Sequence, residues 1–311
     1  MKKPLVSVII PTYNSANLIE RAVSSVLFQT FQDFEIIVVD DGSTDNTAQI
    51  MSRLQKRDSR ILYTHISHSG GAARPKNIGI KMAKAPFIAT LDADDEWYPK
   101  KLEKQIALLS DPSRPRLGYV TCFALYVYEE EKMKFIYRVP RYKDILQRIL
   151  AHDYMGSGSG MIYKKEVFKK VGGFDESLKS GQDAEMRIRL AQYYDFDVVE
   201  DVLFVYYFHK KNISNTLGII KRCEDITKII NKWKHLYSKY PKAHSNRLRF
   251  NGTMCMINGM TAEAKRFFIE STKIYPFNWR SYLYFIFSFL GSNFYRKLTY
   301  IKAGIRHFLK K

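Results

Sequence analysis

The chain has 311 residues, of which 46% are hydrophobic and 26% are charged. This composition is ordinary for a globular protein, and it excludes a disordered chain, a collagen-like chain and a disulfide-rich scaffold. The three cysteines, Cys122, Cys223 and Cys255, are scattered and odd in number. We therefore expect no disulfide framework and a reducing compartment.

The net charge of +19 is concentrated towards the C-terminus. Residues 215–311 contain 19 Lys and Arg against 4 Asp and Glu, whereas the first 214 residues contain 31 against 27. A basic, aromatic-rich region of this kind either meets an anionic partner such as lipid or nucleic acid, or forms a solvated helical face.

The first hundred residues alternate between apolar strands and amphipathic helices. We expect strands at 5–10, 34–39, 61–66 and 87–91, with helices at 14–29, 44–56 and 75–85 between them. Pro11 should stop the first strand, and Asn14 or Ser15 should cap the first helix. Strands that are apolar throughout predict a parallel α/β sheet covered on both faces, with ligands beyond its carboxyl ends.

The pattern changes near residue 118. We expect two strands at 119–128 and 133–139 and a helix at 142–152, followed by a strand at 161–163 after a glycine-rich segment. Helices at 165–171 and 182–194 and a strand at 197–208 follow, and the chain beyond 215 has helical spacing.

The segment with the clearest chemistry is Asp92-Ala93-Asp94-Asp95, directly after the strand at 87–91. Carboxylates this close repel one another unless a cation neutralises them, and oxygen ligands suit Mg²⁺ or Mn²⁺. Side chains two residues apart on an extended segment point the same way, so we expect Asp92 and Asp94 to converge on one ion. The alternative is an acidic cap on the helix that begins near Tyr98.

Two other loops follow strands and carry polar side chains. Residues 11–14, Pro-Thr-Tyr-Asn, offer a ring to stack on a base and a hydroxyl to bond one. Asp40 and Asp41 can accept hydrogen bonds from a ribose hydroxyl or a base N–H. Each segment also fits an ordinary turn before a helix.

Three more positions allow a functional and a structural interpretation. Arg74 and Lys76 follow two glycines at a predicted helix start, which favours an anion, or they are solvated loop charges. Asp183 opens a predicted helix, where it is either a general base or a helix cap. His209 ends the last strand, where it contacts a metal or phosphate or is merely exposed.

Together these segments resemble the family 2 glycosyltransferases of the GT-A fold. The matching text is Val-Ser-Val-Ile-Ile-Pro-Thr-Tyr-Asn at 6–14, Val-Val-Asp-Asp-Gly-Ser-Thr-Asp at 38–45 and Gly-Gly-Ala-Ala-Arg-Pro-Lys-Asn-Ile-Gly-Ile at 70–80. It continues with Leu-Asp-Ala-Asp-Asp at 91–95, Gly-Gly-Phe-Asp-Glu at 172–176 and a Gln-Asp pair at 182–183. The resemblance covers residues 4 to about 215.

The resemblance implies a GT-A fold, with a Rossmann-like, mostly parallel central sheet flanked by helices. The catalytic domain would be 1–215, with a nucleotide-sugar-binding half at 1–117 and an acceptor-binding half at 118–215, followed by a basic helical region at 216–311. The implied activity is metal-dependent, inverting transfer from a nucleotide-diphosphate sugar, most commonly a UDP-sugar. The implied acceptor is a saccharide or lipid-linked hydroxyl in cell-surface polysaccharide or glycolipid synthesis.

The resemblance also assigns roles to residues. Asp183 occupies the position of the catalytic base, and Mn²⁺ or Mg²⁺ would be held by Asp92, Asp94 and His209. The donor would be bound by Pro11, Thr12, Tyr13, Asn14, Asp40, Asp41, Arg74, Lys76, Asp92, Ala93 and Asp94. Two positions depart from the family pattern. Gln182 replaces the usual Glu, and Lys76 replaces the usual Arg, which keeps the charge but loses the bidentate fork.

Two alternatives remain at this point: a nucleotidyltransferase, which would need a glycine-rich pyrophosphate loop after the first strand, and a non-catalytic nucleotide-sugar binder. The acidic segment at 92–95 argues against nucleic acid as a partner of the main domain.

We find no secretory signal and no apolar run of about 20 residues, and expect a cytoplasmic protein. The aromatic segment 281–290 lies between Arg280 and a basic group at 296–306, namely Arg296, Lys297, Lys302 and Arg306. It either rests on the anionic inner face of the cell membrane, packs on the catalytic domain or forms a dimer seam.

Overall fold

The computed structural model describes residues 3–130, 132–142, 144–151, 155–209 and 218–295. The chain divides into two compact units. The first comprises residues 1–145 and 154–216, and the second comprises 146–153 and 217–311. The short stretch 146–153 thus groups with the C-terminal helices, although the sequence pattern places it inside the range 118–215.

The first unit is built on one nine-stranded sheet. Its main path runs β3 (Ile61–His65), β2 (Phe34–Asp40), β1 (Val6–Thr12), β4 (Phe87–Thr90), β8 (Ile162–Lys164), β6 (Leu117–Tyr128), β9 (Asp195–Phe208) and β5 (Glu96–Trp97). β1 to β4 are parallel, β8 is antiparallel to both neighbours, and β6 and β9 are parallel to each other. β7 (Met133–Tyr137) pairs with part of β6. The predicted mostly parallel α/β sheet is confirmed.

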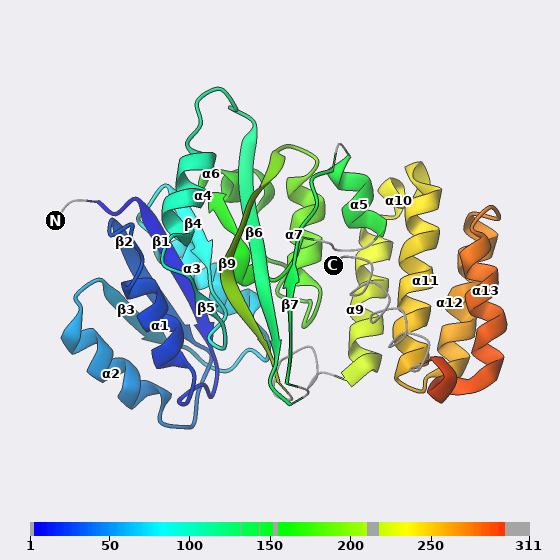
Figure 1. The fold of residues 1–311 in the computed structure, drawn as a ribbon, viewed down its shortest axis with the longest axis horizontal. Helices are drawn as coiled ribbons and strands as arrows, with labels where there is room; N and C mark the ends of the chain where they lie inside the picture. Colours follow the sequence, from blue (N-terminus) through cyan, green and yellow to red (C-terminus); the bar gives the residue numbers. More distant parts are fainter. Residues whose placement is uncertain (1–2, 131, 143, 152–154, 210–217, 296–311) are drawn as a thin grey trace. The chain divides into compact units, whose positions relative to one another are not determined.

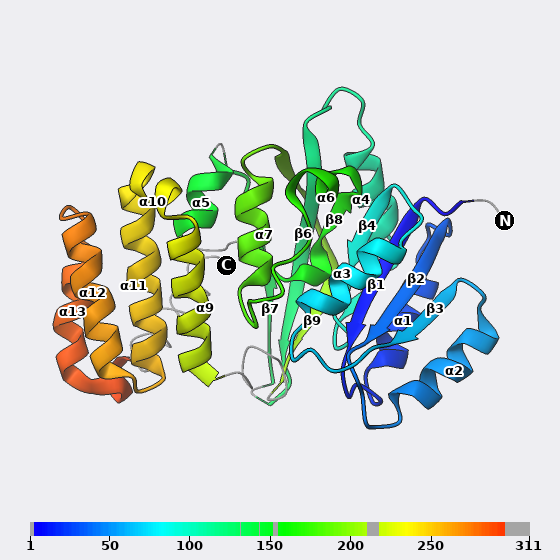
Figure 2. The same ribbon diagram turned by 180° about the vertical axis from the view of Figure 1, so that it is seen from behind.

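Alternate side chains of β1 face different helices. Val8 and Ile10 join a buried cluster with the apolar sides of α1 (Ile19–Leu27), α2 (Thr47–Arg57) and α4 (Lys101–Leu109). Ile9 faces the other way, towards α3 (Ala73–Met82). Figure 1 shows α1 in front of the strands, and the reverse view in Figure 2 shows α3 in front. A strand buried on both faces explains the continuous apolar run.

Gly79 lets α3 approach β1 closely. A Cβ atom built at Gly79 would lie 2.4 Å from Cγ2 of the fully buried Ile9. Gly79→Ala should therefore destabilise the protein, because overpacking costs about 1–3 kcal/mol and the better helix propensity of Ala recovers at most about 1 kcal/mol. Urea unfolding measures the loss. Lys81→Ala, on the exposed side of α3, is the control, and equal stability of the two variants would contradict this packing.

Two local expectations at the end of β1 are wrong. The strand does not stop at Pro11 but continues to Thr12, with Pro11 opposite Val39. β4 pairs with β1 only as far as Ile9, so the missing N–H of proline lies beyond that ladder. The helix begins at Ile19, and neither Asn14 nor Ser15 caps it through its side chain.

The second unit is helical through residue 295, as the spacing predicted. Its helices are α9 (Gly218–Lys232), α10 (Lys234–Lys239), α11 (Pro241–Ile257), α12 (Thr261–Ile274) and α13 (Trp279–Phe287), with the 3₁₀ turn η2 (Ser288–Leu290). Most of α5 (Ile145–Ala151) joins them, and Tyr237 donates a hydrogen bond to the Leu150 carbonyl at 3.1 Å. Phe268 and Tyr295 lie in its core.

Two of the cysteines that are far apart in the sequence lie side by side, with the Sγ atoms of Cys223 and Cys255 3.0 Å apart. Cys122, Cys223 and Cys255 are free thiols. No helix within the described ranges combines the length and hydropathy required to cross a bilayer. The basic group at 296–306 lies outside the described residues, so its expected membrane role has no structural description.

Candidate active site

The loops after β1 and β2 are tied together by Asn14. Its N–H donates to Ser43 Oγ at 2.8 Å, and its Oδ1 accepts from the Thr44 N–H at 2.8 Å. Asn14 has a positive φ of 47°, a conformation that Asn tolerates better than most residues. The side chain predicted to cap α1 instead joins two loops at the carboxyl edge of the sheet.

The pair Asp40 and Asp41 is buried and bonded within its own loops. Asp40 accepts hydrogen bonds from Tyr63 Oη at 2.6 Å and the Ser43 N–H at 2.8 Å. Asp41 accepts from the Ser69 N–H at 2.8 Å and the Gly70 N–H at 3.2 Å. These carboxylates shape the loop at 68–70, and the structure leaves neither exposed for the direct nucleoside contact expected from sequence.

Tyr13 and Thr12 lie on the same edge. The Tyr13 ring is 47% exposed and stacks on His68, with ring centroids 4.2 Å apart. The Thr12 hydroxyl is buried and has no hydrogen-bond partner among the described residues. His68 was missed by the sequence analysis, although it lies only two residues before Gly70.

The acidic loop after β4 is a turn, because the Asp95 N–H donates to the Asp92 carbonyl at 3.1 Å. The rule for extended segments therefore does not apply to this loop, and the convergence of Asp92 and Asp94 on one ion stays a prediction. Asp94 Oδ2 lies 3.1 Å from His209 Nε2, whereas Asp92 Oδ1 lies 3.8 Å from Lys76 Nζ. Ala93 packs into the apolar core, so only its backbone is available to a ligand.

Asp95 is fully buried and supports this turn. It accepts hydrogen bonds from Ser159 Oγ and from the Tyr207 N–H. Ser159 Oγ also accepts from the Asp92 N–H at 3.0 Å. Burial and the charges of Asp94 and Asp92 raise the pKa of Asp95 well above its ordinary value. Ser159 was missed because the segment 156–160 was interpreted only as the approach to a strand.

Asp183 is joined to the acidic loop through Lys76. The Lys76 ammonium is buried, 3.2 Å from Asp183 Oδ1, and so bridges the carboxylates of Asp183 and Asp92. Asp183 lies in the first turn of α7 (Gln182–Leu190), and the residue before that helix is Gly181. The structure thus places residues 92, 94 and 183 in one region, with Lys76 among them.

The charges of this region shift the two carboxyl groups in opposite directions. Burial raises the pKa of Asp92 above its ordinary value; Lys76 opposes the rise, and Asp94 and Asp183 reinforce it. Burial also acts to raise the pKa of Asp183, but Lys76 and Arg187 outweigh it and hold that pKa below its ordinary value. Asp183 is therefore a carboxylate throughout the neutral range.

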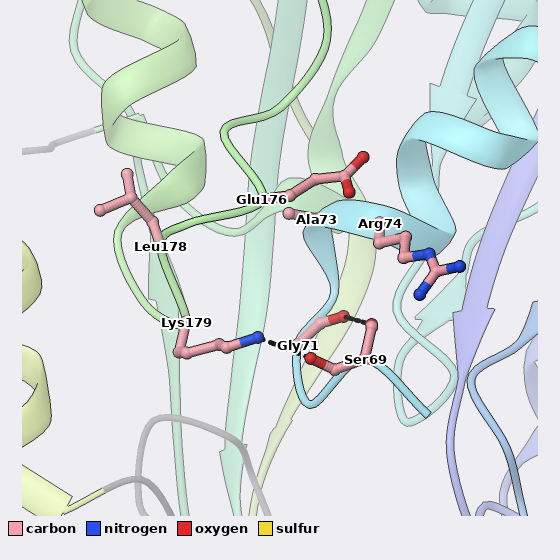
Figure 3. A pocket seen from close by; sticks show the side chains of 7 residues that line it. All are labelled: Ser69, Gly71, Ala73, Arg74, Glu176, Leu178 and Lys179. Carbon is pink, nitrogen blue, oxygen red and sulfur yellow. Dashed lines mark hydrogen bonds between the residues drawn. The ribbon is translucent and has the colours of Figure 1, made fainter. Parts of the chain in front are cut away.

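Arg74 and Lys76 differ in solvent exposure, because Lys76 is buried. Arg74 is exposed at the start of α3 and lines an open pocket of about 220 Å³ with Gly71, Glu176 and Lys179 (Figure 3). Lys179 Nζ donates to the Ser69 carbonyl at 2.6 Å, which ties the far wall of this pocket to the loop at 68–70. Glu176 ends the motif quoted at 172–176 but was given no role, and Lys179 was missed because it comes from a loop far along the chain.

No three His, Cys, Asp or Glu side chains gather closely enough to hold a metal ion within the part of the chain that the structure describes. Asp94 and His209 form a pair, and Asp92 faces Lys76 instead. The three-residue metal set expected from the sequence is therefore not assembled by the protein alone.

Comparison with known proteins identifies the class. The family described as Glycosyl transferase family 2 matches residues 7–172, more than half of the chain. An uncharacterized glycosyltransferase of Rickettsia prowazekii is 32% identical over 266 residues, which cover 83% of this chain and 76% of that protein. One of Rickettsia typhi is 35% identical over 204 residues, and the match spans 63% of each chain, less than two thirds of that relative. The chain belongs to glycosyl transferase family 2 and is a glycosyltransferase.

Solved structures agree with the predicted fold. TarS 1-349 of S. aureus, solved in complex with UDP-GlcNAc, has a TM-score of 0.66 at 19% identity over 96% of this chain and 92% of that chain. The mannosyltransferase PcManGT from Pyrobaculum calidifontis, solved in complex with GDP-Man and Mn2+, has a TM-score of 0.61 at 20% identity over 88% and 76%. The GT-A fold predicted from the motifs is confirmed.

Proposed function

We propose that this protein transfers a sugar from a nucleotide-diphosphate sugar, a UDP-sugar in the first instance, to an acceptor hydroxyl with inversion at the anomeric carbon. The observation that carries the proposal is the group formed by Asp183, Lys76 and Asp92, which unites an ionised carboxylate with the acidic loop at the ligand-binding edge. The TarS and PcManGT structures, solved with UDP-GlcNAc and with GDP-Man, support a donor of this class.

The nucleoside would lie against the exposed ring of Tyr13, with the buried Thr12 hydroxyl as a hydrogen-bond partner. Asp40 and Asp41 would act indirectly, by holding the loop that carries His68. Arg74, exposed at the N-terminus of α3, would face the diphosphate, because the helix dipole and its cation both favour an anion there.

A divalent cation fits the acidic loop. Asp92 and Asp183 lie beside the Lys76 ammonium, the charges of Asp92 and Asp94 act on Asp95, and Asp94 lies 3.1 Å from the His209 imidazole. Carboxylate oxygen and imidazole nitrogen are suitable ligands for Mn²⁺, and carboxylate oxygen for Mg²⁺. Asp94 and His209 would hold the ion beside Asp92, and the ion would stabilise negative charge on the leaving diphosphate.

Asp183 would act as the general base. Its carboxylate would accept the proton of the acceptor hydroxyl while the hydroxyl oxygen attacks the anomeric carbon and the bond to the diphosphate breaks. Attack from the face opposite the leaving group inverts the configuration. Lys76 would keep Asp183 ionised and fix the direction in which its free oxygen points.

A thermal-shift screen of UDP- and GDP-sugars with and without Mn²⁺ tests the donor and the metal together. Binding to the folded state raises Tm by an amount that grows with the logarithm of ligand concentration over Kd, so a UDP-sugar with Mn²⁺ should give the largest rise at equal concentration. Asp94→Asn and His209→Ala should each remove the Mn²⁺-dependent part of that rise. Asp201→Asn, an exposed carboxylate paired with Lys104, is the matched control. No rise with any nucleotide sugar would overturn the donor assignment.

The C-terminal region supports a peripheral position on the anionic inner face of the cell membrane, close to lipid-linked or saccharide acceptors. Tyr282, Ile286, Phe289 and Leu290, here named the α13 stripe, recur at helical spacing and are 45–64% exposed. Apolar side chains on one helix face within a basic region favour an interfacial helix. The free cysteines agree with a reducing compartment.

Flotation with vesicles of anionic and neutral phospholipid tests this position. Ile286→Glu with Phe289→Glu should abolish flotation on anionic vesicles, whereas Phe28→Glu, 76% exposed in the first unit, should not. The full-length protein is required, because residues 146–153 belong to the unit that a truncation at 215 would remove. Unchanged flotation of the double variant would contradict a membrane role of the α13 stripe.

A further inference from the structure

The second unit contains an open pocket that the proposed transfer reaction does not use. It has a volume of about 350 Å³ and lies at the N-terminal ends of α11 and α13. Its lining consists of three aromatic rings, two amides and two cations, namely Tyr275, Phe277, Trp279, Asn246, Asn278, Lys242 and Arg280. Pockets of a few hundred Å³ that combine aromatic walls with a few polar groups are typical ligand sites.

Buried polar side chains hold this pocket in shape. Asn278 is 9% exposed, and its Nδ2 donates to Ser245 Oγ at 2.9 Å and to Asn246 Oδ1 at 3.2 Å. The Ser245 and Ser271 hydroxyls are 2.8 Å apart, and Ser271 contacts Ser281 Oγ at 2.7 Å. This network joins the loop before α13 to both α11 and α12, so the rings on that loop are displayed by a fixed backbone.

The aromatic rings are exposed to an unusual degree for side chains on such a fixed backbone. Phe277 is 82% exposed and Trp279 is 64% exposed. Large rings left in water beside a concave surface indicate a contact with a ligand. A pyranose ring has an apolar face of C–H groups that packs on an aromatic ring, and its hydroxyl groups bond with an amide such as that of Asn246.

The charges in the pocket select among saccharides. Among the residues that the structure describes, its lining includes Lys242 and Arg280 and no carboxylate side chain. The Arg280 guanidinium lies over the Trp279 ring, 5.5 Å from its centroid, so a cation accompanies one face of that ring. A guanidinium binds carboxylate or phosphate oxygens in bidentate fashion. The surrounding region is strongly basic, which favours an acidic ligand over a neutral one.

We propose that this pocket, centred on Trp279, is a secondary binding site for an acidic saccharide that carries carboxylate or phosphate groups. This proposal rests on the proposed function, because the saccharide bound here would be the acceptor of the transfer reaction. A glycosyltransferase must keep its acceptor bound while the sugar is transferred. The pocket holds the saccharide by ring stacking and by charge, and it takes no part in the transfer reaction.

Titration of the full-length protein with oligogalacturonate, followed by calorimetry, tests the site. Binding should weaken at least tenfold in Trp279→Ala and in Arg280→Gln. Phe289→Ala, which removes an equally exposed ring from the α13 stripe outside the pocket, should leave it unchanged. Circular dichroism melting verifies that each variant is folded, since Trp279 and Arg280 are both exposed.

Three results would overturn the proposal: no binding of oligogalacturonate, equal binding of neutral maltooligosaccharides, or a Trp279→Ala defect confined to binding of anionic vesicles. Hydrolysis of the nucleotide-sugar donor, measured on the same variants, should be unchanged. Loss of oligogalacturonate binding with normal donor hydrolysis would confirm the site. Absence of donor hydrolysis in the unaltered protein with normal saccharide binding would count against the proposed function alone.

Discussion

Asp183→Asn is expected to reduce sugar transfer by about 10²–10⁴-fold, because a positioned general base contributes an acceleration of that size. Donor affinity should be nearly unchanged, since the residues proposed to hold the nucleoside lie on other loops. Steady-state transfer and thermal shift with the donor measure the two quantities. Asp195→Asn, an exposed carboxylate paired with Arg116, is the control. Turnover near that of the unaltered protein would remove the base assignment.

The pH profile of the unaltered protein follows from the same group. Asp183 must be deprotonated to act, and Lys76 and Arg187 outweigh burial to hold its pKa below the ordinary value. The base is therefore fully ionised at neutral pH, and its protonation begins only in strong acid. We expect no fall in kcat/KM between pH 8 and pH 5 that is caused by this residue.

Lys76→Met is expected to cause the largest loss of stability among the substitutions considered. The change leaves the carboxylates of Asp92 and Asp183 without the buried ammonium between them. The loss should be about 3 kcal/mol, at the low end for a broken buried pair because both carboxylates keep some contact with water. Urea unfolding at pH 7 measures it, and Lys76→Arg should recover part of the stability because the charge is kept.

The destabilisation should depend on pH with a definite sign. Without Lys76, burial raises the pKa of both carboxyl groups in the folded protein. The loss is therefore fully present only above these raised folded-state values, and it fades as the pH falls towards the unfolded-state values. The stability difference between Lys76→Met and the unaltered protein should therefore shrink on going from pH 7 to pH 4. The acid limb of any remaining activity should move to higher pH. A difference that is constant with pH would show that packing, not charge, is the role of Lys76.

The sequence allowed the fold to be predicted because its signals are local. The strands β1 and β2 are buried at every position and mostly apolar, and the helices around them have a clear periodicity. The errors occurred where local rules compete with tertiary contacts. Asn14 looks like a helix cap until its side chain is seen to bond Thr44, and the acidic segment looks extended until its hydrogen bond shows a turn.

The candidate site could be predicted only in part. Asp183 and the acidic loop were found through motifs, but the role of Lys76 depends on a partner 107 positions away. The sequence position of Lys76 near a helix start and its positive charge suggested that it contacts a ligand. In the structure its side chain is buried and pairs with two carboxylates. His68, Ser159 and Lys179 were missed because each acts through a loop whose neighbours are set by the sheet order, which no local pattern reveals.

The position of residues 146–153 in the sequence affects the order in which the two units are synthesised and can fold. The chain crosses between the two units three times, and the Leu150 carbonyl meets its partner Tyr237 87 residues later. During synthesis at about 5–20 residues per second, this short helix emerges several seconds before the helices it packs against. The C-terminal helices therefore cannot be replaced freely by gene fusion, because residues 146–153, which pack against them, lie within the sequence of the first unit.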